Sequence, residues 1–251
     1  MQERNLILLT GTIDPSFFNG DSADKKVNVV LIDPKERLAQ YEDVISRMIQ
    51  ESAYSDIVFI ENTNYPFNSD KYLEMAYKAG KSFECIRHMH SEEDLFKLRE
   101  LGKSYGEAAL IDYAIKKSDL IADMDEIYKI TGRVFLKNSA QVIKGKKSCP
   151  NQIITKNKIG WCNTEFFKVN KADYLSYLST AMEYVNDYNE ESIERIYYRL
   201  AKKSGMRIKS FPTYPLLSGR VASTISRTYD KTGWRLWAYR TLNYLGYYNL
   251  K

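Results

Sequence analysis

Two basic side chains flank a glycine at the end of an apolar segment, in the run Lys129-Ile-Thr131-Gly132-Arg133. Glycine at the end of a strand leaves room for a ligand to approach the backbone closely. With Lys129 and Arg133 on either side, such an opening predicts a clamp for an anion such as a diphosphate. The alternative is an ordinary β-turn with two solvated basic residues, because Gly-Arg pairs are common in turns.

Polar residues and glycine also follow three other apolar segments. These are Leu6–Thr10 with Gly11 and Thr12, Val27–Ile32 with Asp33, and Ile57–Ile60 with Glu61 and Asn62. Short apolar strands that alternate with amphipathic helices predict a parallel sheet covered on both faces. Ligands of such sheets bind outside the carboxyl ends of the strands. We therefore expect one site to contain Thr10 to Thr12, Asp33, Glu61, Asn62 and Thr131 to Arg133.

The pattern changes in the second half of the chain. It predicts two strands and two helices, then a loop and a closing helix: Gln152–Thr155, Thr164–Val169, Lys171–Val185, Glu190–Lys203, Phe211–Tyr229 and Trp234–Tyr248. The first half, residues 1–150, is typical of nucleotide binding, and residues 151–251 are assigned to acceptor binding. No linker composition separates the halves, so we expect one domain over residues 1–251.

The composition indicates a globular protein with a substantial core. The chain has 251 residues, of which 44% are hydrophobic and 27% are charged. Its net charge of +5 fits an anionic ligand or a membrane surface, but is too weak to imply nucleic acid. The 20 tyrosines suit sugar-binding surfaces and membrane interfaces as well as cores.

The cysteines and the hydropathy favour a cytoplasmic location. Cys85, Cys149 and Cys162 show no metal-ligand spacing, and no signal-peptide pattern opens the sequence. Reduced cytosolic thiols are therefore expected. No apolar run reaches the length of about eighteen residues that a membrane-spanning helix needs.

Read together, short blocks along most of the chain resemble a known enzyme group. The blocks are Leu9 to Ile13, Arg37 with Tyr41, Glu61 to Thr63, Gly102 to Glu107 with Asp112-Tyr113, Lys129 to Arg133 with Asn138, Asn163 to Val169, and Glu194 to Tyr198. In this order they resemble bacterial GT-A-type glycosyltransferases from the capsule and O-antigen clusters of polysaccharide and lipopolysaccharide biosynthesis.

The resemblance implies an α/β fold of the GT-A-like, or Rossmann-like, kind. A mixed, mainly parallel sheet would be flanked by helices, with a helical C-terminal part. It implies a hexosyltransferase-like enzyme that moves a sugar from a nucleotide-diphosphate donor to a lipid-linked glycan, with inversion, in bacterial surface polysaccharide synthesis. Its place would be the cytoplasm or the cytoplasmic face of the inner membrane. Two alternatives stay open: a nucleotidyltransferase of sugar activation, and a non-catalytic, membrane-associated glycan-binding protein.

The chain departs from this group at its metal motif. GT-A enzymes commonly carry an Asp-X-Asp after a central strand, where it holds a divalent metal on the donor diphosphate. Here Asp123-Met-Asp125 precedes the strand Ile127–Ile130, and Thr131-Gly132-Arg133 follows it. Lys129 and Arg133 would then neutralise the leaving diphosphate, because developing charge sits on phosphate oxygens. We expect no cofactor and no metal site, with Mg²⁺ or Mn²⁺ dependence as the alternative.

An inverting transfer needs a carboxylate that takes the proton of the acceptor hydroxyl. The resemblance points to Glu194, near the start of a late helix, and Glu107 competes with it. Glu190, Glu191 and Glu194 together would also complement a helix N-terminus without any catalytic role. Glu107 follows Tyr105-Gly106 at a helix start, where a carboxylate can cap the helix.

For the donor, Gly11 and Thr12 would let the ribose or base pack closely, and Asp33 would accept from the uracil or ribose. Arg37 would reach the phosphates, and Asn62 would hold the base or sugar. Arg37 could equally be a solvated helix residue, and Asn62 a turn residue.

Each of three further features has two possible interpretations. The loop Ser218–Arg227 carries Arg220 and Arg227 among hydroxyls, as a lid over the diphosphate or as a disordered basic loop. The closing helix suits a membrane interface or ordinary core packing, because apolar and aromatic residues lie towards one side with basic residues nearby: Trp234, Trp237, Tyr244, Leu245 and Tyr248, with Lys231, Arg235 and Arg240. His88 and His90 are expected to be exposed loop residues rather than catalytic groups.

Overall fold

The computed structural model describes residues 4–18, 31–145, 149–219 and 228–250. At its centre lies a seven-stranded sheet. Its strands, in spatial order, are β10 (Ile208–Lys209), β6 (Asn151–Gln152), β9 (Phe166–Asn170), β4 (Glu126–Thr131), β1 (Leu6–Gly11), β2 (Asp56–Glu61) and β3 (Ser82–Arg87). β1 pairs in parallel with β2 and β4, and β2 with β3, whereas β9 runs antiparallel to β4 and β6. The sheet is therefore mixed and mainly parallel.

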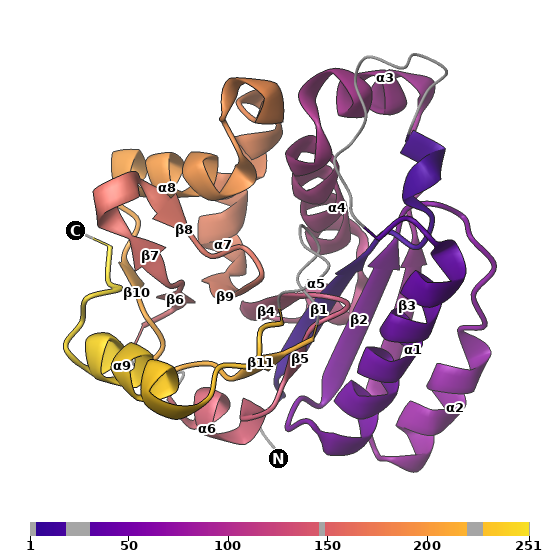
Figure 1. Ribbon diagram of the computed structural model, residues 1–251. Coiled ribbons are helices and arrows are strands. Elements are labelled where there is room, and N and C mark those ends of the chain that lie inside the picture. The colour runs from indigo at the N-terminus through magenta and orange to yellow at the C-terminus, as the bar shows by residue number, and fades with distance from the viewer. Residues whose placement is uncertain (1–3, 19–30, 146–148, 220–227, 251) are drawn as a thin grey trace.

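Helices lie on both faces of this sheet (Figure 1). They are α1 (Pro34–Glu51), α2 (Asp70–Lys78), α3 (Glu92–Leu101), α4 (Lys103–Lys117), α5 (Asp119–Ala122), α6 (Ser139–Lys144), α7 (Lys171–Asp173), α8 (Ile193–Ser204) and α9 (Gly233–Tyr244). Short 3₁₀ segments are η1 (Pro15–Phe18), η3 (Asn157–Ile159), η5 (Ser179–Glu183) and η6 (Asp187–Asn189), and η4 (Tyr174–Leu178) is a π-helical turn. Two small ladders pair β5 (Phe135–Leu136) with β11 (Leu217–Ser218), and β7 (Thr155–Lys156) with β8 (Trp161–Cys162).

Successive residues of a strand face opposite sides, so each central strand contributes to two cores. Leu6 and Leu8 of β1 belong to the core with α4, α8 and η4. Ile7 and Leu9 belong to the core with α1 and α2. Because both faces are covered, the central strands are apolar nearly throughout, which is the pattern that the sequence presents. The prediction of an α/β fold with a mixed, mainly parallel sheet flanked by helices is confirmed.

Some predicted elements differ from the observed ones. Residues 27–30 of the predicted strand Val27–Ile32 lie outside the described residues, and Leu31 and Ile32 belong to no strand. The predicted helix Lys171–Val185 is divided into α7, η4 and η5. The closing helix ends at Tyr244, and Tyr248 is buried beyond its end. One sheet contains strands from before and after residue 150, because β9 pairs with β4.

Candidate functional site

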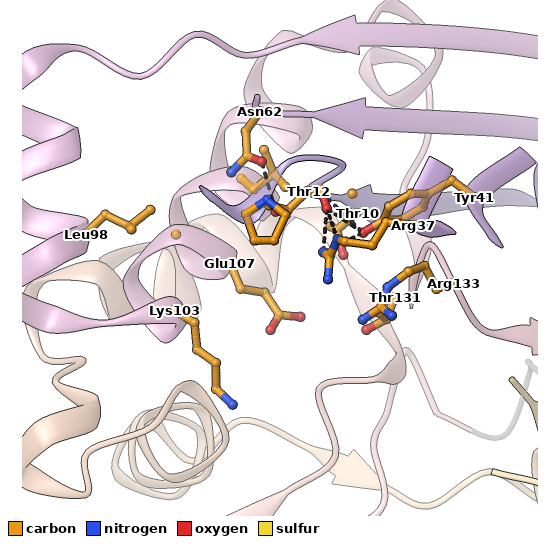
Figure 2. A pocket seen from close by; sticks show the side chains of 14 residues that line it. Thr10, Thr12, Arg37, Tyr41, Asn62, Leu98, Lys103, Glu107, Thr131 and Arg133 are labelled. Carbon is orange, nitrogen blue, oxygen red and sulfur yellow. Dashed lines mark hydrogen bonds between the residues drawn. The ribbon is translucent and has the colours of Figure 1, made fainter. Parts of the chain in front are cut away.

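A pocket lies at the carboxyl ends of β1 and β4, where the chain changes direction along the sheet. From β1 the chain passes to β2 and β3 on one side, and then returns to β4 on the other. Ligands of open α/β sheets bind at such a switch point. The pocket, shown in Figure 2, is lined by Thr10, Gly11, Thr12, Pro15, Arg37, Tyr41, Asn62, Leu98, Lys103, Gly106, Glu107, Leu110, Thr131 and Arg133. We call it the strand-end pocket.

Two arginines from different elements reach this pocket, and both are almost fully buried. Arg37 of α1 is 4% exposed, and Arg133, after β4, is 5% exposed. Arg37 donates from Nε to the Thr12 carbonyl at 2.8 Å and from Nη1 to the Leu31 carbonyl at 3.1 Å. Arg133 donates from Nη1 to Gln40 Oε1 at 3.2 Å, while its buried Nε has no partner among the described residues.

The two guanidinium groups interact unfavourably. Burial lowers the pKa of Arg37, and the charge of Arg133 lowers it further, while Tyr41 and Asp14 act in the opposite direction. Within the described residues, neither guanidinium forms an ion pair with a carboxylate. Buried cations without a carboxylate partner are costly, so this arrangement favours an anion in the pocket.

Gly132 has a packing role that differs from the sequence interpretation. Its amide donates to the Thr10 carbonyl at 2.8 Å. A Cβ at this position would lie 2.9 Å from that carbonyl oxygen and 3.1 Å from the Tyr41 ring. The glycine therefore brings the turn after β4 against β1 and α1. This close contact joins parts of the protein to one another and does not face a ligand.

A chain of polar contacts fixes the loop after β1. Thr12 Oγ1 donates to Asn62 Oδ1 at 2.9 Å, and Asn62 Nδ2 lies 3.0 Å from His90 Nε2. Burial lowers the pKa of His90 to about 4, so the ring is neutral and Nε2 can accept the amide proton. The expectation of exposed loop histidines is wrong for His90, which is 8% exposed and packs beside His88.

Glu107 and Lys129 form an ion pair between α4 and β4. Lys129 is fully buried, and its Nζ also donates to the Thr164 carbonyl at 2.7 Å. Glu107 keeps about a third of its side chain exposed and lines the strand-end pocket, where Figure 2 shows its carboxylate pointing into the open space. Lys129 does not line that pocket, so it reaches the site through Glu107.

Glu194 lies next to this pair without lining the pocket. It is the second residue of α8, and its Oε1 accepts from Thr164 Oγ1 at 3.2 Å. Thr164 thus contacts both Lys129, through its carbonyl, and Glu194, through its hydroxyl. The structure brings the two carboxylates predicted from sequence to the same region, with different access to the pocket.

The start of α4 is held from the other half of the chain. Asp187 of η6 accepts from the Ser104 amide at 3.0 Å and from the Ser104 hydroxyl. Gly102, at φ +94°, precedes the helix, and a Cβ there would lie 2.6 Å from Asp187 Oδ2. This cap fixes the helical turn from which Lys103 and Glu107 face the pocket.

Other residues predicted for the site lie elsewhere. Glu61 is fully buried, and its carboxylate accepts from Ile13 N at 3.1 Å, from Thr63 and from Arg87 Nη1 at 3.0 Å. It joins the loops after β1 and β2 behind the pocket. Asp33 is exposed and caps α1 by accepting from Lys35 N at 2.9 Å. Arg220 lies outside the described residues.

Asp123-Met-Asp125 lies at the opposite edge of the sheet from the pocket. These residues separate α5 from the start of β4, whereas the pocket adjoins the end of that strand. In the described part of the chain, no cluster of three or more His, Cys, Asp or Glu side chains could hold a metal ion.

Sequence reasoning missed several pocket residues. Tyr41 belongs to a block that carries the resemblance but was assigned no role in the site, and its hydroxyl accepts from Thr12 N at 2.9 Å. Lys103, Leu98 and Pro15 reach the pocket from α4, α3 and η1. Their positions depend on how helices pack over the sheet, and nothing in their local pattern signals this.

No family model matches the chain, and no curated protein matches it. Solved structures with a similar arrangement include the glycosyltransferase GlyE of Streptococcus pneumoniae TIGR4, with TM-score 0.47 and 10% identity over 83% of this chain and 46% of that one. Another is a proposed nucleotide-diphospho-sugar transferase of Desulfovibrio desulfuricans G20, with TM-score 0.46 and 8% identity over 81% of this chain and 78% of that one. A third is the nucleoside-diphosphate-sugar pyrophosphorylase of Vibrio cholerae RC9, with TM-score 0.44 and 13% identity over 81% of this chain and 89% of that one. Similarities at this level decide neither family nor reaction.

Proposed function

We propose that the protein transfers a sugar from a nucleotide-diphosphate donor to a hydroxyl group of a glycan, without a metal ion. The observation that carries this proposal is the pair of buried guanidiniums of Arg37 and Arg133 at the ends of β1 and β4. A diphosphate would supply anionic oxygens to these two guanidiniums, neither of which forms an ion pair with a carboxylate of the described residues. It would also accept bidentate hydrogen bonds, which suit the planar guanidinium.

The remaining pocket residues fit the other parts of such a donor. Thr12 and Asn62 present a hydroxyl and an amide beside Gly11, at the end of β1, for the ribose or base. Glu107 presents carboxylate oxygens that a sugar hydroxyl can donate to. Lys129 and Glu61 take positioning roles, because their polar groups are engaged inside the protein.

The same pocket favours glycosyl transfer over nucleotidyl transfer. A nucleotidyltransferase needs Mg²⁺ held by acidic residues at the site of phosphoryl attack. Among the described residues, the strand-end positions that line the pocket are Thr10, Gly11, Thr12, Asn62, Thr131 and Arg133, and none of them is acidic. The carboxylate of Glu107 comes from α4 and is paired with Lys129. During departure of a nucleoside diphosphate, the arginines would stabilise the charge that develops on its phosphate oxygens.

We further propose that α9 holds the protein at an anionic membrane surface, where a lipid-linked acceptor of surface polysaccharide synthesis would lie. Trp234, Trp237, Tyr244 and Leu245 are 75%, 70%, 88% and 71% exposed. Arg235 and Arg240 are exposed on the same helix. Exposed aromatic side chains beside basic ones bind the headgroup region of bilayers. No helix in the described ranges is both long and apolar enough to cross a membrane.

A thermal-shift experiment tests the donor proposal. UDP, GDP, dTDP and their sugar conjugates are added to the full chain in EDTA, with and without excess Mn²⁺ or Mg²⁺. A ligand that binds only the folded state raises the melting temperature, by an amount that grows with its concentration over Kd. We expect stabilisation by at least one nucleoside diphosphate in EDTA. Stabilisation that requires the metal would overturn the metal-free model, and no response to any nucleotide would overturn the donor proposal.

A further inference from the structure

A second pocket lies beside the beginning of β9, with a volume of about 250 Å³. It is lined by Lys137, Ile154, Asn163, Glu165, Phe166, Tyr214, Pro215, Leu216, Leu217, Tyr229, Asp230, Lys231 and Leu236. We call it the Glu165 pocket. Its walls combine aromatic rings with hydrogen-bonding groups, as sugar-binding sites do, because a pyranose presents both C–H faces and hydroxyls.

Glu165 is the carboxylate of this pocket, held by two neighbours. Its Oε1 accepts from the Tyr229 hydroxyl at 2.5 Å, and its Oε2 lies 3.3 Å from Asn163 Nδ2. Burial raises the pKa of Glu165, and these hydrogen bonds act in the opposite direction. A carboxylate with a raised pKa is a stronger base than a solvated one, and the two hydrogen bonds hold its oxygens at the wall of the pocket.

The Glu165 pocket adjoins the strand-end pocket at the end of β4. The Thr131 amide donates to the Glu165 carbonyl at 2.9 Å, so the two residues that line the separate pockets are joined by a backbone hydrogen bond. The Glu165 carboxylate also interacts electrostatically with Lys129 and Glu107, the ion pair at the floor of the donor site. Groups bound in the two pockets would therefore lie on either side of Thr131 and Glu165.

We propose that the Glu165 pocket binds the acceptor sugar and that Glu165 is the base that deprotonates its hydroxyl, an inference that rests on the glycosyl transfer proposed above. Tyr214 and the partly exposed Tyr229 supply aromatic walls for the sugar, and Lys231 offers an ammonium that already donates to Tyr214 Oη at 2.7 Å. Glu107 is less suited to the task, because protonation would break its ion pair with the buried Lys129. Glu194 reaches neither pocket.

In the proposed step, the acceptor oxygen forms a bond to the anomeric carbon of the donor sugar while its proton passes to a Glu165 carboxylate oxygen. The bond from the anomeric carbon to the diphosphate breaks, and its electron pair leaves with the phosphate oxygen. Arg37 and Arg133 balance the charge of the departing nucleoside diphosphate. Glu165 then returns its proton to solvent.

Kinetics of Glu165→Gln test the assignment. The probes are p-nitrophenyl glycosides of glucose, galactose and N-acetylglucosamine as acceptors, with nucleoside diphosphate release as the signal. At saturating donor we expect turnover to fall about a hundred- to ten-thousandfold, while the Kd for the nucleoside diphosphate stays unchanged. Glu93→Gln on the exposed surface of α3 is the matched control and should behave as wild type. Glu107→Gln and Glu194→Gln are measured in parallel.

Tyr229→Phe provides a second test that hardly disturbs packing. It removes one hydrogen bond that favours the ionised Glu165, so the acid limb of the turnover profile should move to higher pH. The charged groups around this site (Glu107, Lys129, Asp230 and Lys231) remain in place in this variant. The assignment of Glu165 as the base is wrong if folded Glu165→Gln turns over at the wild-type rate, or if the pH profile of turnover does not move in Tyr229→Phe. It is also wrong if the wild type shows no turnover with any of the glycosides. If the wild type bound no nucleotide, the proposal of a nucleotide-diphosphate donor would itself be wrong.

Discussion

Lys129 and Glu107 form an ion pair in which the ammonium is buried inside the protein and only the carboxylate reaches the pocket. The cation keeps the anion in place, and α4 and β4 are joined beneath the strand-end pocket. The lysine that the sequence suggested as half of a phosphate clamp thus holds another site residue.

A double-mutant cycle measures this pair. Glu107→Gln leaves the buried Lys129 ammonium without its charged partner and should lower the free energy of unfolding by about 3 kcal/mol. The double variant Lys129→Met/Glu107→Gln should regain part of that loss, because no unpaired charge remains. Urea unfolding of the four proteins gives the coupling energy, and additive effects would show that the pair contributes nothing as a pair.

Arg133→Met should separate stability from ligand binding. In the absence of ligand it removes a buried charge that repels Arg37, so the melting temperature should stay equal or rise. Binding of a nucleoside diphosphate should weaken by about 1.5–3 kcal/mol, which is the size of a hydrogen bond to a charged group. Calorimetry measures the affinity of Arg133→Met and of the exposed control Arg195→Met for the nucleoside diphosphate. Equal affinities would mean that the turn after β4 has a structural role only.

Lowering the pH should destabilise the fold through His90. Its folded-state pKa of about 4 lies below the ordinary value of 6.5, so the unfolded chain binds more protons between these values. Stability is therefore lost as the pH falls from 6.5 to 4. Burial lowers the pKa of His88 as well, which acts in the same direction. His90→Gln should flatten the dependence of melting temperature on pH in this window, and an unchanged slope would contradict the prediction.

Gly132→Ala should damage the site through packing. The added Cβ would collide with the Thr10 carbonyl and the Tyr41 ring, at a cost of about 1–3 kcal/mol. Since the collision displaces β1 from the turn, nucleotide affinity should fall as well. Retained stability and affinity in Gly132→Ala would refute the close approach.

Vesicle sedimentation tests α9. The wild type should bind liposomes that contain anionic phosphatidylglycerol, and Trp234→Ala/Trp237→Ala should bind them much less, because both side chains are exposed. Nucleotide affinity should not change, since neither residue lines a pocket. Equal binding of both proteins to the vesicles would exclude the helix as a membrane contact.

The sequence predicts the strands and helices that have a periodic hydrophobic pattern, but it predicts fewer of the residues that form the site. Continuous apolar strands and amphipathic helices predict the first half of the sheet, because burial on both faces leaves a local pattern. Strand ends also locate Thr12, Asn62 and Thr131. The ion pair of Lys129, the inward turn of Glu61 and the pocket position of Glu165 depend on contacts between residues far apart in sequence. No local pattern records such contacts.

The cap that Asp187 provides for Ser104 has a consequence for how this protein can be divided. Among the described residues, all those that line the strand-end pocket belong to residues 1–150, so this half could be taken for an independent binding unit. Yet the first turn of α4 is fastened from residue 187, and β4 depends on β9 for its second neighbour. A fragment that ends near residue 150 would therefore contain the residues of the pocket but lack the contacts that hold α4 and β4 in place.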